Sequence, residues 1–427
     1  MIEKQKYLIY LTIFLYVFYN EAFANTITFD NFSNRIQLHQ QGEYYLNKKT
    51  GQKIILSNRL IIKLDNSSTT IKPQHSKNQL LNYHPQIISQ TTLYIGDTYT
   101  YYSVEIKDIE QLANVLTYFQ QQPSISLVQP DILQIKRNTN LVLSNQPKNN
   151  SLKKSELIKA KQSAYLSILD IADYWPYSKG KGVKVAIIDD GFNFEHPDLQ
   201  NVNTLFSYDV ENKILNATAN KHTDKHGTKV MGIIFAEHNQ IGIDGIAPEA
   251  DFIAIKQPDS WTSNTLLSFY LSALAGADII NCSWHSQWLL QPIAEIINDL
   301  SVNGRKGKGL GVVFSAGNNG KEINNSSHEA AINSAIVVGA NNKQGKILPF
   351  SNYGKSVDFF AFGGKVKTTV VSGKYGIFSG TSLSAAIVSG IAALKLSQQP
   401  DLTLAQLTSS LKAIKNLNKQ SEQHDKK

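Results

Sequence analysis

The 427-residue chain contains only one cysteine, Cys282. A single cysteine excludes an intramolecular disulfide framework, and it excludes any zinc or iron–sulfur site built from several thiolates. The sequence also lacks internal repeats, and after its first 24 residues it has no apolar run long enough to cross a membrane. The stability of the fold must therefore come from the size of its core, for which a hydrophobic content of 42% is ample.

Long clusters of basic residues are missing as well. Lys and Arg number 42 against 34 Asp and Glu, which gives a formal net charge of +8. Proteins that bind nucleic acid or anionic membrane surfaces concentrate such a surplus in one segment or patch. Because this sequence spreads it, we interpret the surplus as general solubility charge and expect no nucleic-acid partner. A basic protein held on anionic surfaces is an alternative, and its retention would be sensitive to salt.

The first 24 residues have the order of a secretory signal peptide. Lys4 and Lys6 precede an apolar and aromatic run over residues 7–19, and Ala22-Phe23-Ala24 places small residues two apart. That run is shorter than the ~20 residues that a membrane-spanning helix needs, which disfavours the alternative of a membrane anchor. We expect cleavage after Ala24 and a secreted or periplasmic protein with no stable membrane span once the signal is removed.

The rest of the chain divides into five parts by composition. We expect a polar lead at 25–56, a small α+β domain at 57–137, a linker and processing region at 138–163, a large domain at 164–416, and a charged tail at 417–427. The small domain has strand patterns at 59–64, 99–106 and 125–131, and a helical pattern at 108–116. The large domain alternates short apolar runs with helical patterns, which indicates a doubly wound, mostly parallel α/β sheet flanked by helices.

Two polar cues follow buried runs in the large domain. The run at 185–188 ends in Asp189 and Asp190, where the carboxyl end of a parallel strand collects functional groups. Further along, His226 opens a helix whose apolar residues lie on one face. A solvated turn acid explains the carboxylates equally well, and a histidine near a helix start usually has a structural role, so these cues matter only in combination.

Two more cues come from the C-terminal half. Ser382 lies in the first turn of a buried helix, where it is either an ordinary cap or a nucleophile beside free backbone N–H groups. Asn318 follows the buried strand at 312–315 inside a loop bracketed by glycines. Alone it is a turn signal, but beside a nucleophile its amide could donate a hydrogen bond to an oxyanion.

The order Asp, His, Asn, Ser on a parallel α/β sheet resembles the subtilisin-like serine proteases. The Asp segment 183–199, His226-Gly227-Thr228, Ser315-Ala316-Gly317-Asn318 and Gly380-Thr381-Ser382 are similar to motifs of that family, and the resemblance extends over roughly 175–415. The domain at 57–137, ending in Val128-Gln129-Pro130-Asp131, resembles the family's inhibitory propeptide.

The resemblance implies an exported serine endopeptidase made as a self-processing precursor. Ser382 would attack the peptide carbonyl, His226 would act as base and then acid, and Asp189 would orient the imidazole. Asn318 and the Ser382 N–H would hold the oxyanion. Peptide or protein substrates and the chain's own propeptide, acting as an intramolecular inhibitor, are the partners implied.

The resemblance also implies which residues bind substrate, and there the sequence departs from the family. The implied substrate-binding residues are Ser283, Trp284, His285, Ala316 and Gly317. His285 stands where the family usually has glycine, so we expect a narrowed cleft. Ala386 replaces a usual proline, and Ala361-Phe362-Gly363 a usual Ala-Pro-Gly. These changes keep open a non-catalytic peptide- or partner-binding module on the same fold.

No cofactor is expected for catalysis, and no zinc motif is present. Relatives often bind structural calcium, but no acid-rich loop here has a recognisable spacing of ligands. The metal content is therefore left open, with structural calcium as a hypothesis.

Overall fold

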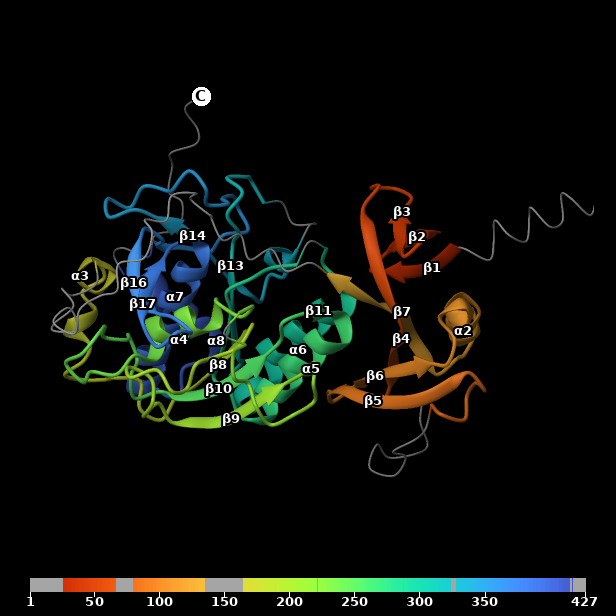
Figure 1. Cartoon of the computed structure of the whole chain (residues 1–427), viewed down its shortest axis with the longest axis horizontal. Helices are drawn as coiled ribbons and strands as arrows, with labels where there is room; N and C mark the ends of the chain where they lie inside the picture. The colour runs from red at the N-terminus through yellow and green to blue at the C-terminus, as the bar shows by residue number, and fades with distance from the viewer. Residues whose placement is uncertain are drawn as a thin grey trace, which may run out of the picture. The chain divides into compact units, whose positions relative to one another are not determined.

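The computed structural model describes residues 26–66, 80–134, 164–220, 222–286, 288–323, 328–414 and 417. The expected signal segment, the linker at 138–163 and the tail beyond Leu417 lie outside the described residues. The chain divides into two compact units, one formed by the residues up to Gln134 with Trp261–Ser263, the other by the remainder (Figure 1).

The N-terminal unit is an antiparallel sheet covered by a helix. Its strands follow the order β1-β2-β3-β4-β6-β5, and β7 pairs with β4. The strands are β1 (Thr26–Asn31), β2 (Asn34–Gln41), β3 (Tyr44–Asn47), β4 (Lys53–Asp65), β5 (Ile87–Ile95), β6 (Tyr99–Ile106) and β7 (Ile125–Gln134). The helix α2 (Leu112–Gln120) buries Leu112, Val115, Leu116 and Phe119. Of the predicted helical stripe, Ile109 lies in the preceding 3-10 turn η2 (Ile109–Gln111) and is exposed.

The segment expected to be a polar lead outside the α+β domain is part of the sheet of this unit. Residues 26–56 form β1, β2, β3 and the start of β4, and they belong to the same sheet as the strands that follow. Only a few apolar side chains of this segment are buried, among them Ile27, Phe29 and Leu38. Because alternate residues of a strand face opposite sides, a segment rich in Asn and Gln can still present a continuous apolar face. The α+β domain therefore includes the residues from Thr26 onwards.

The C-terminal unit contains a parallel sheet in the order β15-β14-β13-β12-β8-β10-β9. Its strands are β8 (Lys184–Asp189), β9 (Thr204–Asp209), β10 (Asp251–Lys256), β12 (Ile279–Cys282), β13 (Gly311–Ser315), β14 (Ile336–Asn341) and β15 (Phe359–Phe362), with a separate antiparallel pair β16 (Val366–Thr369) and β17 (Tyr375–Phe378). The short β11 (Ser260–Trp261) leads into the segment Trp261–Ser263 that is assigned to the N-terminal unit. The helices are α3 (Ala164–Ile168), α4 (Gly227–Phe235), α5 (Thr262–Leu274), α6 (Gln291–Gly307), α7 (Thr381–Gln398) and α8 (Leu404–Lys412), with 3-10 turns η4 (Ile171–Asp173) and η5 (Glu329–Ala331). The expected doubly wound, mostly parallel sheet is confirmed.

Helices cover both faces of this sheet. Val313 of β13 packs with residues of α4 and α7 in one large cluster, whereas the next residue, Phe314, contacts Phe269 of α5. Successive side chains of a strand point to opposite faces, so α4 and α7 lie on one face and α5 on the other. The two helices α4 and α7 lie side by side (Figure 1), and both begin at the edge of the sheet where the strands end.

The order of the strands fixes where a site can form. The chain runs from β8 through β9 and β10 on one side, and then returns to place β12 on the other side of β8. In open α/β sheets, ligands bind outside the carboxyl ends of the strands at such a change of direction. The residues that follow β8 and β12 therefore lie at the position in the sheet where such a crevice is expected.

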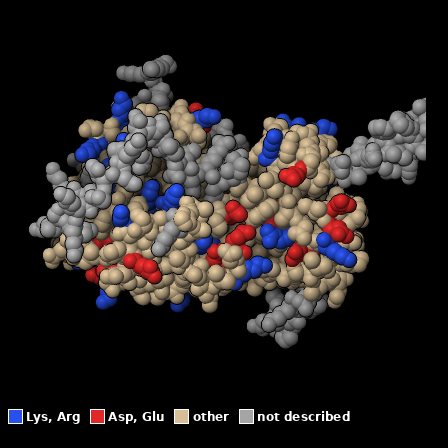
Figure 2. Space-filling model, viewed as in Figure 1, with Lys and Arg blue, Asp and Glu red and all other residues tan. Residues whose placement is uncertain are grey.

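Charged side chains of both signs are interspersed on the face shown in Figure 2, where no continuous basic surface is visible. Among the helices that the structure describes, none is both long and apolar enough to cross a membrane.

Candidate active site

Asp189 lies at the carboxyl end of β8, after four fully buried residues. Its side chain is 1% exposed, which makes the carboxylate dependent on protein hydrogen bonds. Oδ1 accepts the backbone N–H of Asp190 at 2.8 Å. Both oxygens also lie within hydrogen-bond distance of one imidazole nitrogen, which belongs to His226.

His226 occupies the N-cap position of α4. Its Nδ1 is 2.9 Å from Oδ2 and 3.0 Å from Oδ1 of Asp189, so Nδ1 carries the proton and Nε2 is the free base position. The ring of Phe378 packs edge-on against the imidazole, with centroids 5.5 Å apart. Two contacts therefore fix the plane of the ring.

The electrostatic surroundings favour a charged imidazole. Burial lowers the pKa of His226, but the charge and hydrogen bond of Asp189 and the charge of Asp190 outweigh burial, so the pKa is raised above its ordinary value. Lys229, one turn along α4, acts in the opposite direction. A raised pKa means that this histidine accepts a proton more readily than an isolated imidazole.

Ser382 is the second residue of α7, which follows Gly380 at a positive φ of 110°. Its hydroxyl donates to the carbonyl oxygen of Ser283 at 2.9 Å. Since a hydroxyl has one proton, the Ser382 proton points to Ser283 in this structure, and the hydroxyl has to rotate to direct it to His226. Apo sites often show such a loose arrangement of nucleophile and base.

Asn318 follows β13 and contacts the start of the same helix. Its Oδ1 accepts from the backbone N–H of Thr381 at 2.8 Å and from the Thr381 hydroxyl at 3.0 Å. The Thr381 Oγ1 in turn accepts the N–H of Gly317 at 3.2 Å. The Nδ2 donor of the same amide also lies beside Gly380, 3.2 Å from the point that a Cβ atom on this glycine would occupy.

The segments named as substrate-binding in the sequence lie together at this edge of the sheet. His285 is buried against Gly317, where a Cβ atom would lie only 2.8 Å from the imidazole Cε1. Trp284 is different, because its side chain is buried and its Nε1 donates to the carbonyl oxygen of Ile188 at 2.6 Å. The Trp284 indole therefore supports the sheet.

Asn352 is a residue of this site whose role the sequence analysis missed. Its Nδ2 donates to the carbonyl of Ala316 at 2.8 Å, and its backbone N–H donates to the carbonyl of Gly317 at 2.9 Å. Its Oδ1 also accepts from the N–H groups of Asn319 and Lys321. One asparagine thus holds the loop that carries Asn318, and the signal that the sequence offered for it was the segment Phe350-Ser351-Asn352-Tyr353-Gly354, which is also similar to a motif of the subtilisin-like proteases.

A second group of buried polar residues lies behind His285. The His285 and His328 rings have centroids 5.0 Å apart, and the Glu329 Oε2 accepts the N–H of Ser286 at 2.9 Å. Burial lowers the pKa of His328 to about 4 and raises the pKa of Glu329. At neutral pH the imidazole of His328 is therefore uncharged, and it packs against the His285 ring.

The described residues do not assemble a recognisable metal centre. No group of three or more His, Cys, Asp and Glu side chains among them is arranged to hold an ion. Asp198 is a buried carboxylate, but its Oδ2 already accepts from the N–H of Ile243 at 2.9 Å and from the hydroxyl of Tyr375 at 3.0 Å. Structural calcium stays a hypothesis, and no step of the chemistry depends on it.

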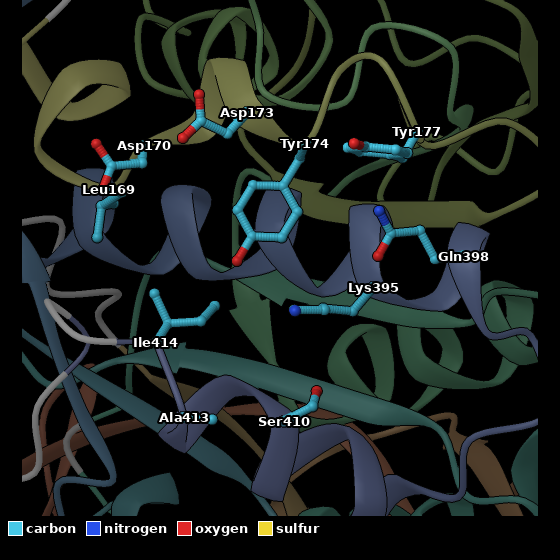
Figure 3. Close-up of a pocket in the computed structure, with 10 residues that line it drawn as sticks. All are labelled: Leu169, Asp170, Asp173, Tyr174, Tyr177, Lys395, Gln398, Ser410, Ala413 and Ile414. Atoms are coloured by element: carbon cyan, nitrogen blue, oxygen red, sulfur yellow. The ribbon is translucent and has the colours of Figure 1, made fainter.

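The hollow shown in Figure 3 is separate from these residues. It has a volume of about 430 Å³, and it is lined by residues such as Tyr174, Lys395 and Ile414. Lys395 lies 13 residues beyond Ser382 on α7, which at 1.5 Å per residue is about 20 Å along the helix. Lys395 also places its ammonium 4.9 Å from the centroid of the Tyr174 ring, so it has a structural contact there.

Comparison with known proteins agrees with this geometry. The model of the subtilase family matches residues 180–424, which is more than half of the chain. Subtilisin E of Bacillus subtilis (strain 168) is 35% identical over 243 residues, covering 55% of this chain and 60% of subtilisin E. A thermophilic serine proteinase of Bacillus sp. (strain AK1) is 35% identical over 237 residues, covering 53% of this chain and 55% of that protein.

Among solved structures, a cold adapted subtilisin-like serine proteinase matches 55% of this chain and 82% of its own, with 25% identity and a TM-score of 0.48. The matched part of this chain covers 60% of the length of subtilisin E and 55% of the length of the thermophilic proteinase. The family match covers β8 to α8, and hence all four of Asp189, His226, Asn318 and Ser382. This chain belongs to the subtilase family.

Proposed function

We propose that the protein is a serine endopeptidase that hydrolyses peptide bonds. The observation that carries the proposal is the buried Asp189–His226 pair at the end of β8, beside an α7 whose first turn holds Ser382 and is tied to Asn318. Membership of the subtilase family supports the same reaction. A non-catalytic binding module is not favoured, since each of the four side chains that the chemistry needs is present.

The proposed reaction begins with rotation of the Ser382 hydroxyl from the Ser283 carbonyl towards His226. Ser382 Oγ attacks the peptide carbonyl carbon while His226 Nε2 takes its proton, and Asp189 stabilises the imidazolium that forms. The imidazolium then gives the proton to the leaving amine, which leaves an acyl-enzyme. Water, deprotonated by the same imidazole, attacks the acyl-enzyme and releases the second product.

The negative oxygen of each tetrahedral intermediate lies between the Asn318 Nδ2 and the Ser382 N–H in this proposal. Backbone N–H groups at a helix start are unpaired and carry a partial positive charge of about half a unit. Neither donor has to reorganise as the charge develops, because Oδ1 of Asn318 is already held by two hydrogen bonds from Thr381.

Replacing Asn318 with alanine tests this assignment. We expect kcat to fall by about 10²–10³, the loss known for the corresponding change in subtilisin itself, with little change in KM. The reason is that the lost hydrogen bond forms only with the charged intermediate. Steady-state kinetics on a chromogenic peptide would measure both constants, and an effect confined to KM would contradict the role.

His285 is proposed to restrict the substrate side chain that precedes the scissile bond. Its ring is buried against Gly317, between the two segments that would receive that side chain. A substrate would pair with the backbone of Ser283–His285 as an added strand. The narrowed cleft expected from the sequence is therefore kept as part of the proposal.

The variant His285→Gly should accept larger side chains. We expect the ratio of kcat/KM for a phenylalanine over an alanine p-nitroanilide substrate to rise at least about tenfold, since filling freed space is worth that much or more. His222→Gly, a histidine at an exposed position before α4, is the matched control and should leave the ratio unchanged. An unchanged ratio in folded His285→Gly would rule the restriction out.

The N-terminal unit is proposed to be a propeptide that guides folding and blocks the site until export. A parallel sheet forms from contacts distant in sequence and folds slowly, so a template is useful to an exported protease. We place this domain from Thr26 to about residue 137, with self-cleavage in or just before the linker at 138–163. Removal of a signal at Ala24 and secretion, or release to a periplasm, complete the proposal.

A further inference from the structure

A second carboxylate stands directly beside Asp189. Successive residues at the end of a strand point in opposite directions, so Asp189 and Asp190 cannot both reach the imidazole from one side. Asp189 contacts the His226 ring. Asp190 turns to the backbone of the segment that carries this ring.

Asp190 accepts hydrogen bonds from three consecutive backbone N–H groups. Its Oδ2 lies 2.9 Å from the nitrogens of Lys225 and His226, and its Oδ1 lies 2.7 Å from that of Gly227. Three donors on two oxygens favour the ionised carboxylate, although burial and then the charge of Asp189 raise the pKa of Asp190. The bonds cross 35 to 37 positions of sequence, and they join the end of β8 to the start of α4.

The start of α4 needs such an outside acceptor because of the residue that occupies it. An N-cap residue usually satisfies the first N–H groups with its own side chain. Here the N-cap is His226, which makes no side-chain cap hydrogen bond because its ring is directed to Asp189. Without Asp190, the N–H of Gly227 and its neighbours would lose their acceptor, and the histidine would lose the anchor of its backbone.

Asp190 also has an electrostatic effect on the imidazole of His226, because its charge raises the pKa of that ring. The groups that act on His226 are Asp189 and Asp190 from β8 and Lys229 from its own helix. The two carboxylates favour the imidazolium, and Lys229 disfavours it. Asp190 therefore affects both the place and the charge of the proposed base.

We propose that Asp190 is a positioning residue for His226, holding the histidine by its backbone while Asp189 holds it by the ring. The inference rests on the proposed function, since it assigns Asp190 to the same reaction. It goes beyond the four side chains already given roles.

Two substitutions separate the backbone anchor from the charge. Asp190→Asn keeps the size but loses the charge and one strong acceptor, and we expect kcat/KM to fall roughly 10–100-fold through kcat, as for a small displacement of a catalytic group. Asp190→Thr restores a helix cap without a charge, so part of the rate should return. Asp401→Asn, which removes an exposed carboxylate paired with Lys308, should leave the rate unchanged.

The pH profile gives a readout that a purely structural role would not move. His226 must be neutral to act as a base, so activity rises with pH through its pKa. Loss of the Asp190 charge lowers that pKa, and both Asp190 variants should shift the acidic limb to lower pH. Lys229→Gln should shift the limb to higher pH, because it removes the opposing charge.

A titration of His226 by NMR in the Ser382→Ala chain gives the same comparison without catalysis. Among the ten histidines of the chain, the signal of His226 is identified as the one that is lost in His226→Gln. If the wild type hydrolyses no peptide, the proposed function fails, while a lower His226 pKa in Asp190→Asn would still support the coupling. Unshifted profiles and titrations in both Asp190 variants, with rate losses that only follow the loss of folded protein, would overturn the inference.

Discussion

Replacing Ser382 with alanine should abolish peptide hydrolysis and leave the chain as an unprocessed precursor. The substitution removes the only atom proposed to attack the substrate, and it keeps the backbone N–H at the start of α7. We expect kcat to fall by a factor on the order of 10⁶, the value known for loss of the nucleophile in subtilisin itself. Intact mass spectrometry should find the variant roughly 110–135 residues longer than the processed wild type, given the position of the linker.

The matched control is Ser397→Ala, which removes an exposed serine hydroxyl in the last turn of the same helix. It should be processed and should react with a fluorophosphonate probe like the wild type. Equal labelling of Ser382→Ala and the wild type would contradict the proposed nucleophile. Identical masses with lost labelling would instead separate the two parts of the proposal, because hydrolysis would stand and self-cleavage would fall.

Replacing Asp189 with asparagine should cost a factor of about 10⁴ in kcat. Asp189 holds the proton on Nδ1 of His226 through contacts of 2.9 and 3.0 Å, whereas an asparagine amide can present its N–H and stabilise the other tautomer. The loss of the charge also lowers the pKa of His226, since burial then has less opposition. More of the imidazole is neutral at low pH as a result, yet it is the wrong tautomer for accepting the Ser382 proton.

Kinetics against pH would test both consequences. The acidic limb should move to lower pH while the plateau falls, and Asp173→Asn, which changes an acid of η4 in the lining of the separate hollow of Figure 3, should change neither. A plateau within tenfold of the wild type would show that Asp189 does not orient the base. Circular dichroism of the Asp189→Asn variant would show whether it is folded, so that a loss of activity caused by unfolding is recognised.

Much of the candidate site could be predicted from local sequence patterns. A buried apolar run followed by Asp189, and a helical stripe that starts at His226 or Ser382, each place a polar residue at the end of an element. In a parallel sheet the ends of strands share one edge, so side chains distant in sequence converge there. The strand and helix positions around these residues differ from the expected ones by only one or two residues.

Other parts of the structure left too weak a signal in the sequence. The strands β1–β3 carry few apolar residues, and their sheet became recognisable only through the pairing of β3 with β4. Asp190 appeared in the sequence only as the second acid after a buried run, since nothing in its neighbourhood revealed that the N–H groups of residues 225–227 lie opposite it. Trp284 was expected to bind substrate because it lies in the segment 283–285, but its indole donates a hydrogen bond to the carbonyl oxygen of Ile188 in β8.

The sequence by itself determined the family, the parallel sheet and the identity of the four residues proposed for the reaction. The lone Cys282 illustrates the limit of that knowledge: composition excluded disulfides, and the fold then buried this residue at the end of β12. Only the tertiary structure decided which partner each polar side chain contacts, namely Ser283 for Ser382, Thr381 for Asn318 and the start of α4 for Asp190. The physical reason is that spacing and propensity set the elements, whereas hydrogen bonds between elements depend on strand order and packing, which bring together residues dozens of positions apart.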